Sequence, residues 1–406
     1  MSRPRCMLIG VGRLAGGFVA PVLGAAGWEV VLAGRDPVIC ATIDKAGGLW
    51  LRQAGDPAQD RWFGGIGALT LDDPSLRRLA AGADLFATSV GPASLQAVGR
   101  LLAPLLRARL EASNAPVNVI TFENHRRAPE LLAVGLFEAD GSLAGVVGRR
   151  LGISGAAAWR TVSRREVTDA GVRFHVNDVS DCYVDGAALL ASAAPMDGSI
   201  PGLEPVQPFE WYMAEKLWGF NAGHATAAYL GWRAGCATID EAMAHPDIRT
   251  AVAGVVGEAQ QVFQLRQAAS PGSTPVRRRP LDWILARYAD PGLGDPVTRV
   301  GREPRRKLAA GDRFIGPAVA SLATGLRPVA LAHGAAAALA YRESTDRQAG
   351  DLQRELELLG PAEVLATVSM LDPQEELTRL ICEEYREITA GSRGDRPIRP
   401  VNRATA

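Results

Sequence analysis

The fold is decided by a glycine-rich stretch near the N-terminus, Met7-Leu8-Ile9-Gly10-Val11-Gly12-Arg13-Leu14-Ala15-Gly16-Gly17-Phe18. A helix-like segment, residues 19–26, follows this stretch, and a second apolar run, Glu29-Val30-Val31-Leu32-Ala33, comes next. Strand, glycine turn, helix and strand within about thirty residues are typical of a dinucleotide-binding domain. The context of the glycines therefore predicts a Rossmann-type domain in the first half of the chain.

Each small residue of the turn has a role in this interpretation. Gly10 allows the tight turn, Gly12 lets a pyrophosphate approach the backbone, and Ala15 permits close packing of the helix on the strand. The helix N-terminus offers free N–H groups and a partial positive charge to the phosphates. Arg13, at the start of that helix, belongs to the same predicted cofactor site.

The end of the second strand bears on the choice between NAD and NADP. An NAD-selective domain usually has Asp or Glu there, which binds the ribose 2′-OH and repels a 2′-phosphate. In this chain Gly34 occupies that position, and Arg35 follows where its guanidinium could pair with a phosphate. Asp36 could instead take the acidic role one residue later, with Arg35 exposed to solvent. We expect NADP(H) to be favoured over NAD(H).

Two later segments fit further strands of the same sheet. Residues 84–90 end in Gly91-Pro92, and residues 117–122 end in Glu123-Asn124. Ligands bind outside the carboxyl ends of parallel strands, so we expect the nicotinamide near these ends. The cofactor-contacting residues predicted here are Val90, Gly91, Pro92 and Glu123, with Asn124 beside them. Asn124 could equally satisfy a loop backbone, a common role for Asn after a strand.

Composition limits the class of protein. The chain has 406 residues, a net charge of zero and five scattered cysteines without a C-x-x-C pair. These features give no reason to expect nucleic acid or a membrane as partner, and they argue for reduced cytoplasmic thiols without a structural metal site. We expect a cytoplasmic protein with a small-molecule substrate. The domains predicted are 1–205, Rossmann-type; 206–390, helical; and 391–406, a disordered tail.

Lysine is rare, and one lysine has distinctive neighbours. Among 44 Lys and Arg residues only Lys45, Lys216 and Lys307 are lysines. An amine can lose its proton and act as a base, whereas guanidinium cannot. Asn221 follows Lys216 by five residues and His224 by eight, so all three would fall within about a 140° arc of an α-helix. The alternatives are a chance lysine on a solvated face and a His that serves only packing.

The helix predicted around these residues spans 211–229 and stops at Gly231. Its sequence, Lys216-Leu217-Trp218-Gly219-Phe220-Asn221-Ala222-Gly223-His224-Ala225-Thr226-Ala227-Ala228-Tyr229-Leu230-Gly231, resembles the signature of the mannitol dehydrogenase family, the polyol-specific long-chain dehydrogenases. The block Arg299-Val300-Gly301-Arg302-Glu303-Pro304-Arg305-Arg306-Lys307 and the chain length resemble most the mannitol-1-phosphate 5-dehydrogenase branch of that family.

The resemblance implies a zinc-independent oxidoreductase with an α/β Rossmann-type domain followed by an all-α domain. It implies that Lys216 takes the proton of a secondary alcohol while hydride leaves for the nicotinamide. Asn221, with Asn124, would hold the developing alkoxide, and His224 would orient the substrate and stabilise the same oxygen. A basic cluster is the candidate phosphate clamp, or else a solvated loop; it comprises Arg302, Arg305, Arg306, Lys307 and Arg313.

Three departures from the family pattern qualify this expectation. Relatives carry Asn-Ile where this chain has Arg13-Leu14, Asp where it has Gly34, and Lys within the stretch that reads Ile315-Gly316-Pro317 here. The first two put NAD use in doubt, and the third puts the substrate and its phosphate in doubt.

The leading expectation is hydride transfer between NADP(H) and a secondary alcohol or ketone of a sugar or polyol phosphate. The alternatives are the same chemistry on a free polyol, a cyclitol or a sugar-bearing intermediate, an opine-type dehydrogenase, and a non-catalytic dinucleotide sensor. Monomer and homodimer are both compatible with the sequence.

Overall fold

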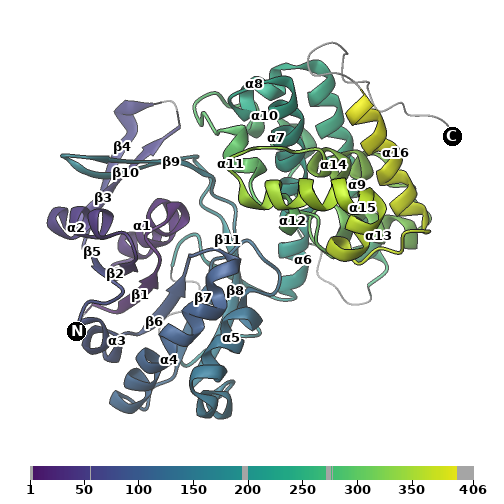
Figure 1. Cartoon of the computed structure of the whole chain (residues 1–406). Helices are drawn as coiled ribbons and strands as arrows, with labels where there is room; N and C mark the ends of the chain where they lie inside the picture. Colours follow the sequence, from purple (N-terminus) through teal and green to yellow (C-terminus); the bar gives the residue numbers. More distant parts are fainter. Residues whose placement is uncertain (1–2, 55, 194–199, 271–275, 277, 391–406) are drawn as a thin grey trace. The chain divides into compact units, whose positions relative to one another are not determined.

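The computed structural model of the protein describes residues 3–54, 56–193, 200–270, 276 and 278–390. The chain divides into two compact units with a boundary between Met213 and Ala214 (Figure 1), and the domain boundary predicted from the sequence is 205/206. The first unit contains all the described strands and the second is helical, which confirms the predicted fold class. The tail predicted to be disordered, 391–406, lies outside the described residues.

The main sheet of the first unit has eight strands in the order β12-β11-β8-β7-β6-β1-β2-β5. The strands from β5 to β8 along this order are all parallel and form the 3-2-1-4-5-6 arrangement of a dinucleotide-binding fold. Their bounds are β1 Arg5–Ile9, β2 Glu29–Gly34, β5 Ile66–Thr70, β6 Leu85–Thr88, β7 Val117–Thr121 and β8 Leu151–Ala158. Strand β11 (Cys182–Asp185) pairs antiparallel with β8, and β12 (Glu204–Val206) pairs parallel with β11.

Both faces of this sheet are covered, as the continuous apolar runs of its strands require. Along β1, Cys6 and Leu8 belong to one core, and Met7 and Ile9 belong to the other. The first core includes side chains of η1 (Ala15–Val19), α1 (Ala20–Ala25) and α2 (Pro37–Ala46). The second core is closed by α3 (Leu76–Ala81), α4 (Leu95–Ala112) and α5 (Ala128–Ala139).

A close approach at the carboxyl ends of β1 and β6 explains Gly10. Its amide donates to Ala33 O at 2.8 Å, and the Ser89 amide donates to Ile9 O at 2.8 Å. Gly10 has a φ of +122°, and a Cβ there would lie 2.4 Å from Ser89 O. The backbone can therefore pass between the two strands only without a side chain.

A second, four-stranded sheet, which the sequence patterns did not predict, covers the helix that follows the glycine turn. Its order is β4-β3-β10-β9, with bounds Gly48–Gln53 for β3, Asp60–Gly64 for β4, Val162–Thr168 for β9 and Gly171–Val176 for β10. A Cβ on Gly16 would lie 2.2 Å from the Phe174 ring of β10. The absence of a side chain at Gly16 therefore allows the Phe174 ring to pack against this helix.

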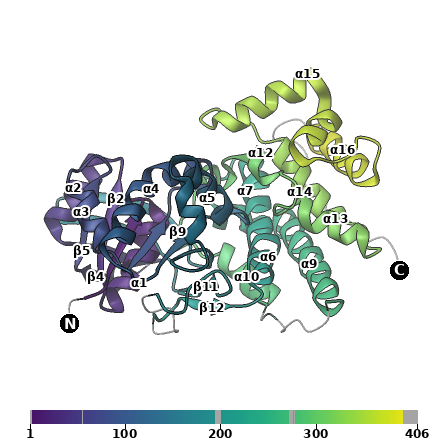
Figure 2. The ribbon, with the colours of Figure 1, turned by 90° about the horizontal axis from the view of Figure 1, so that it is seen from below.

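The second unit is built from helices around α7 (Ala222–Ala234), which packs against α8 and α11, labelled in Figure 1, and against α9 and α14, labelled in Figure 2. Its other elements are α6 (Phe209–Ala214, which crosses the boundary), η5 (Glu215–Asn221), α8 (Ile239–Ala244), α9 (Pro246–Ala268), α10 (Leu281–Tyr288), α11 (Val297–Gly301), α12 (Pro304–Lys307), α13 (Ile315–Ala323), α14 (Val329–Leu339), α15 (Arg347–Ser369) and α16 (Glu376–Ala390). Within the described residues, none of the helices is both long and apolar enough to cross a membrane.

The predicted stop of the central helix at Gly231 is wrong. The helix continues to Ala234 and ends at Gly235. A Cβ on Gly231 would lie 2.5 Å from the Ala242 Cβ of α8, so this glycine permits the close contact of two helices. Glycine inside a helix can thus have a packing role that resembles a stop in the sequence.

Replacement of the two turn glycines should separate folding from cofactor binding. Gly10→Ala should lower the free energy of unfolding by at least about 2 kcal/mol, because the methyl group meets a backbone oxygen and the positive φ is strained. Gly12→Ala should cost much less, since the nearest atom to its Cβ is Ser89 O at 3.6 Å, yet it should weaken dinucleotide binding. Urea unfolding and nicotinamide fluorescence titration measure the two effects. Equal stability losses would contradict the assignment.

Candidate active site

The carboxyl ends of β6 and β7 are joined by Glu123. This side chain is buried, and it accepts hydrogen bonds from Thr88 Oγ1 at 2.8 Å and from Val90 N at 2.9 Å. Burial raises the pKa of the Glu123 carboxyl, and these donors oppose that shift. Glu123 therefore holds the Val90-Gly91-Pro92 turn in place, a supporting role that the sequence does not reveal.

The start of the first helix fits the pyrophosphate of a dinucleotide. The helical residues that lead into η1 begin at Arg13, directly after Gly12, and Ala15 is fully buried against the sheet. A Cβ on Gly12 would lie 3.6 Å from Ser89 O, an ordinary van der Waals distance, so the Gly12 backbone is open to close approach. The N–H groups in the first turn of a helix, next to an open glycine backbone, suit a bound diphosphate.

The end of β2 has no room for the acidic residue of NAD-selective domains. A Cβ on Gly34 would lie 2.5 Å from Val11 Cγ2, and Arg35 is exposed. Asp36 is the N-cap of α2, with its Oδ1 accepting from Val38 N and Ile39 N, each at 3.1 Å. The Asp36 carboxylate is thus engaged in capping the helix.

Lys216 and Asn221 lie on a π-helical segment, η5, and His224 lies in the first turn of α7. The prediction that Lys216, Asn221 and His224 lie within one arc of an α-helix is therefore wrong, because the first two lie on a π-helix. In a π-helix hydrogen bonds run from residue i to i+5, so residues five apart are close to one turn apart on the same side. Lys216 and Asn221 have this spacing, and both side chains are buried. π-Helical turns are frequent at functional sites.

Two contacts hold the π-helical segment in place. The hydroxyl of Tyr288 donates a hydrogen bond to the carbonyl of Phe220. At the other end, the buried carboxyl of Glu215 accepts from Arg279 N at 3.1 Å, and burial raises the pKa of Glu215 to about 8. The segment that presents Lys216 is therefore anchored to α10 and to the chain that leads into it.

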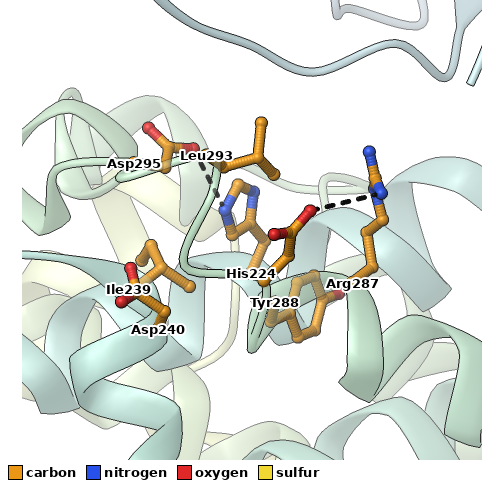
Figure 3. A pocket seen from close by; sticks show the side chains of 8 residues that line it. His224, Ile239, Asp240, Arg287, Tyr288, Leu293 and Asp295 are labelled. Atoms are coloured by element: carbon orange, nitrogen blue, oxygen red, sulfur yellow. Dashed lines mark ion pairs between the residues drawn. The ribbon is translucent and has the colours of Figure 1, made fainter. Parts of the chain in front are cut away.

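His224 is held on two sides (Figure 3). Its Nε2 lies 3.4 Å from Asp295 Oδ2, and its ring stacks on Tyr288 with a centroid distance of 5.2 Å and an interplanar angle of 4°. Burial lowers the pKa of His224, Asp295 opposes this shift, and the charges of Arg299 and Lys307 add to it. The ring lines a pocket together with Asp240, Arg287, Asp290 and other residues of α8, α10 and the following loop.

The basic cluster is largely engaged within the second unit. Arg305 pairs with Glu355, Arg306 with Glu303, and Arg313 with Asp312, whereas Arg302 is exposed. Lys307 is buried and donates to the carbonyls of Val300 and Arg302, with its amine 5.5 Å from the Tyr229 ring centre. Lys307 therefore has a structural role, and most of the predicted clamp is already paired with carboxylates.

Asn124 follows β7 in the first unit and is half-buried, while Lys216, Asn221 and His224 belong to the second unit. Asp295, Tyr288 and Glu215 are members of the site that the sequence reasoning missed. Asp295 and Tyr288 are far from Lys216 along the chain, and Glu215 adjoins it. No rule on spacing along the sequence relates Asp295, Tyr288 or Glu215 to Lys216. Among the described residues, no cluster of three or more His, Cys, Asp or Glu side chains could hold a metal ion.

A Rossmann-type domain followed by a helical domain that carries Lys, Asn and His defines a class of nicotinamide-dependent dehydrogenases. Two family models match the chain: the mannitol dehydrogenase Rossmann domain over residues 4–189 and the mannitol dehydrogenase C-terminal domain over residues 206–388. The chain belongs to the mannitol dehydrogenase family, oxidoreductases that act on CH–OH groups and use a nicotinamide dinucleotide.

Solved structures show the same fold at low sequence identity. Mannitol 2-dehydrogenase of Pseudomonas fluorescens, in a ternary complex with NAD and D-mannitol, has 14% identity and a TM-score of 0.77, with 96% of this chain and 92% of that chain covered. A D-sorbitol dehydrogenase has 14% identity and a TM-score of 0.68, with 95% and 93% covered. An octopine dehydrogenase in complex with NADH and agmatine has 13% identity and a TM-score of 0.51, with 91% and 98% covered.

The pKa of Glu215 predicts a pH-dependent stability term. Between its ordinary value of 4.5 and about 8, the unfolded chain has released the Glu215 proton and the folded chain has kept it. The free energy of unfolding therefore falls as pH rises through this window, by up to ~1.4 kcal/mol per pH unit, and the term is absent below it. In Glu215→Gln, which keeps the acceptor for Arg279 N, this term should vanish.

Urea unfolding of wild type and Glu215→Gln at about pH 5 and at about pH 8 measures the difference. Wild type should lose stability relative to the variant between the two values. The exposed Glu210→Gln on α6 is the control and should follow wild type. A constant difference between wild type and Glu215→Gln would contradict the prediction.

Proposed function

We propose that this protein transfers hydride between NADP(H) and a secondary alcohol or ketone of a polyol or sugar. The observation that carries the proposal is the buried pair of Lys216 and Asn221 on one π-helical turn, with His224 fixed just beyond it. Bound nicotinamide supplies the hydride acceptor in oxidation and the donor in reduction. A dinucleotide sensor would have no need for a buried amine at this place.

Lys216 is the proposed base. In oxidation its neutral amine takes the proton of the substrate hydroxyl as the C–H bond breaks, and in reduction its ammonium returns that proton to the oxygen. Asn221 donates a hydrogen bond from its amide to the same oxygen, which stabilises the alkoxide as it forms. Asn124 is the proposed second donor to that oxygen.

The preference for NADP(H) is proposed from the end of β2. Gly34 is packed against Val11, Asp36 is committed to the cap of α2, and Arg35 remains exposed next to them. An exposed guanidinium at this position suits a 2′-phosphate, which can accept two parallel hydrogen bonds from it.

Two substrate classes are compatible with this chemistry: a sugar or polyol phosphate, and an unphosphorylated polyol, cyclitol or sugar. The pairing of Arg305, Arg306 and Arg313 with carboxylates favours the unphosphorylated class. Each of these ion pairs would have to open before its arginine could bind a phosphate.

The deciding experiment is nicotinamide absorbance with purified protein, NADPH or NADH, and fructose or fructose 6-phosphate as paired substrates. Turnover of fructose with NADPH is the expected result, and preference for the phosphate ester would favour the clamp.

Lys216→Ala should lower kcat at least about a thousand-fold with unchanged NADPH affinity, and Lys216→Arg should not restore it, because guanidinium cannot release its proton. Loss of NADPH binding in either variant would mean that Lys216 is structural.

Cofactor choice has its own test. Arg35→Ser should raise the Kd for NADPH about ten-fold or more and leave the Kd for NADH unchanged, because only NADPH carries the 2′-phosphate. The exposed Arg77→Ser on α3 is the matched control and should change neither Kd. Equal weakening of both cofactors, or of neither, would contradict the proposed preference.

A further inference from the structure

Asp295 is held rigidly next to His224. It is buried, and both of its carboxylate oxygens pair with the guanidinium of Arg299, which lies four residues further along in α11. Its backbone carbonyl accepts from Ile239 N at 2.9 Å, which ties the loop to the start of α8. Burial alone would raise the pKa of Asp295, but Arg299 and His224 lower it to about 2. Asp295 is therefore an ionised carboxylate with a fixed orientation.

The imidazole of His224 is equally fixed. Tyr288 stacks on one face of the ring, and Tyr288 is itself held by its hydrogen bond to the Phe220 carbonyl. Nε2 is the ring nitrogen that faces Asp295, at 3.4 Å. A nitrogen lone pair directed at a carboxylate would be repelled, so Nε2 carries the ring proton.

The other ring nitrogen remains available. Within the described parts of the chain, Nδ1 of His224 has no hydrogen-bond partner, and the ring lines the pocket drawn in Figure 3. Asp240 and Asp290 on the pocket wall would favour a second proton on the ring. Asp290 pairs with Arg287 at 3.7 Å, and burial together with Arg299 and Lys307 lowers the pKa of His224. Because the pKa of His224 is lowered overall, the imidazole is neutral at neutral pH and has a lone pair on Nδ1.

We infer that Asp295, clamped by Arg299, is a positioning residue that fixes His224 as the Nε2–H tautomer, so that Nδ1 accepts a hydrogen bond from a substrate hydroxyl next to the reacting carbon. This inference rests on the proposed function and replaces one role that the family resemblance implies, the stabilisation of the reacting oxygen by His224. A neutral His224 whose only proton faces Asp295 cannot donate to the alkoxide. Stabilisation of that oxygen then falls to the proposed donors Asn221 and Asn124. His224 recognises a neighbouring hydroxyl, which a polyol carries and a simple secondary alcohol lacks.

The tautomer can be read without turnover, by long-range ¹H–¹⁵N correlation of the five histidines, with the His224 signals identified by their loss in His224→Gln. At neutral pH we expect the neutral Nε2–H pattern for His224. Asp295→Asn should change it, whereas Asp60→Asn, which breaks a matched Asp–Arg fork with Arg52 in the second sheet of the first unit, should not. An Nδ1–H tautomer or an imidazolium in the wild type would overturn the inference, even if the proposed reaction is observed.

Kinetics supply the second readout. Asp295→Asn should lower kcat/KM for the polyol about 10–100-fold, mostly through KM, with the Kd for NADPH unchanged. Substrates that lack the neighbouring hydroxyl should lose nothing further in the variant, because the group recognised by Nδ1 is already gone. If Asp295→Asn does not fold, Arg299→Lys can replace it. This variant keeps the positive charge but loses the paired hydrogen bonds to both oxygens of Asp295, and it should show the same pattern more weakly. An equal loss on both kinds of substrate would mean that Asp295 is only structural and would overturn the inference.

Discussion

The hydrogen bond from the Tyr288 hydroxyl to the Phe220 carbonyl anchors the π-helical turn that carries Lys216 and Asn221, and the geometry of the proposed site depends on it. A π-helical turn contains one residue more than an α-helical turn and disturbs the regular pairing of backbone groups, which must then be satisfied elsewhere. Tyr288 supplies a donor at this place. The same ring stacks on His224, so a single buried side chain supports both the turn that carries Lys216 and Asn221 and the orientation of the imidazole beyond it.

In the first unit, too, a few close contacts determine which residues can occupy key positions. Gly10 and Gly16 are small because other parts of the chain, Ser89 and Phe174, lie where a side chain would be. Glu123, at the end of β7, fixes the turn after β6 through Thr88 and Val90. The edge of the sheet at which we propose that the cofactor binds is thus shaped by contacts between neighbouring strands, and the Gly12 backbone there is open to close approach.

The rarity of lysine pointed to two residues, and the structure gives them different surroundings. Lys216 lies on the π-helical turn near Asn221, whereas Lys307 is buried under Tyr229 with its amine bound to two backbone carbonyls. Both lie in blocks that resemble the family pattern. The distinction between a candidate base and a structural cation follows from the partners of each amine, and these partners come from other segments of the chain.

The sequence by itself determined the class of fold, the glycine turn, the absence of an acidic residue at position 34, and the placement of Lys216, Asn221 and His224 on one helical stretch, because each of these depends on local spacing and residue type. It did not determine the second sheet, the continuation of α7 through Gly231, the π-helical turn, or the partners of the basic cluster. Those features depend on contacts between distant segments, such as Gly231 with Ala242 and His224 with Asp295. Periodicity within one segment carries no information about such contacts, so only the tertiary structure could decide them.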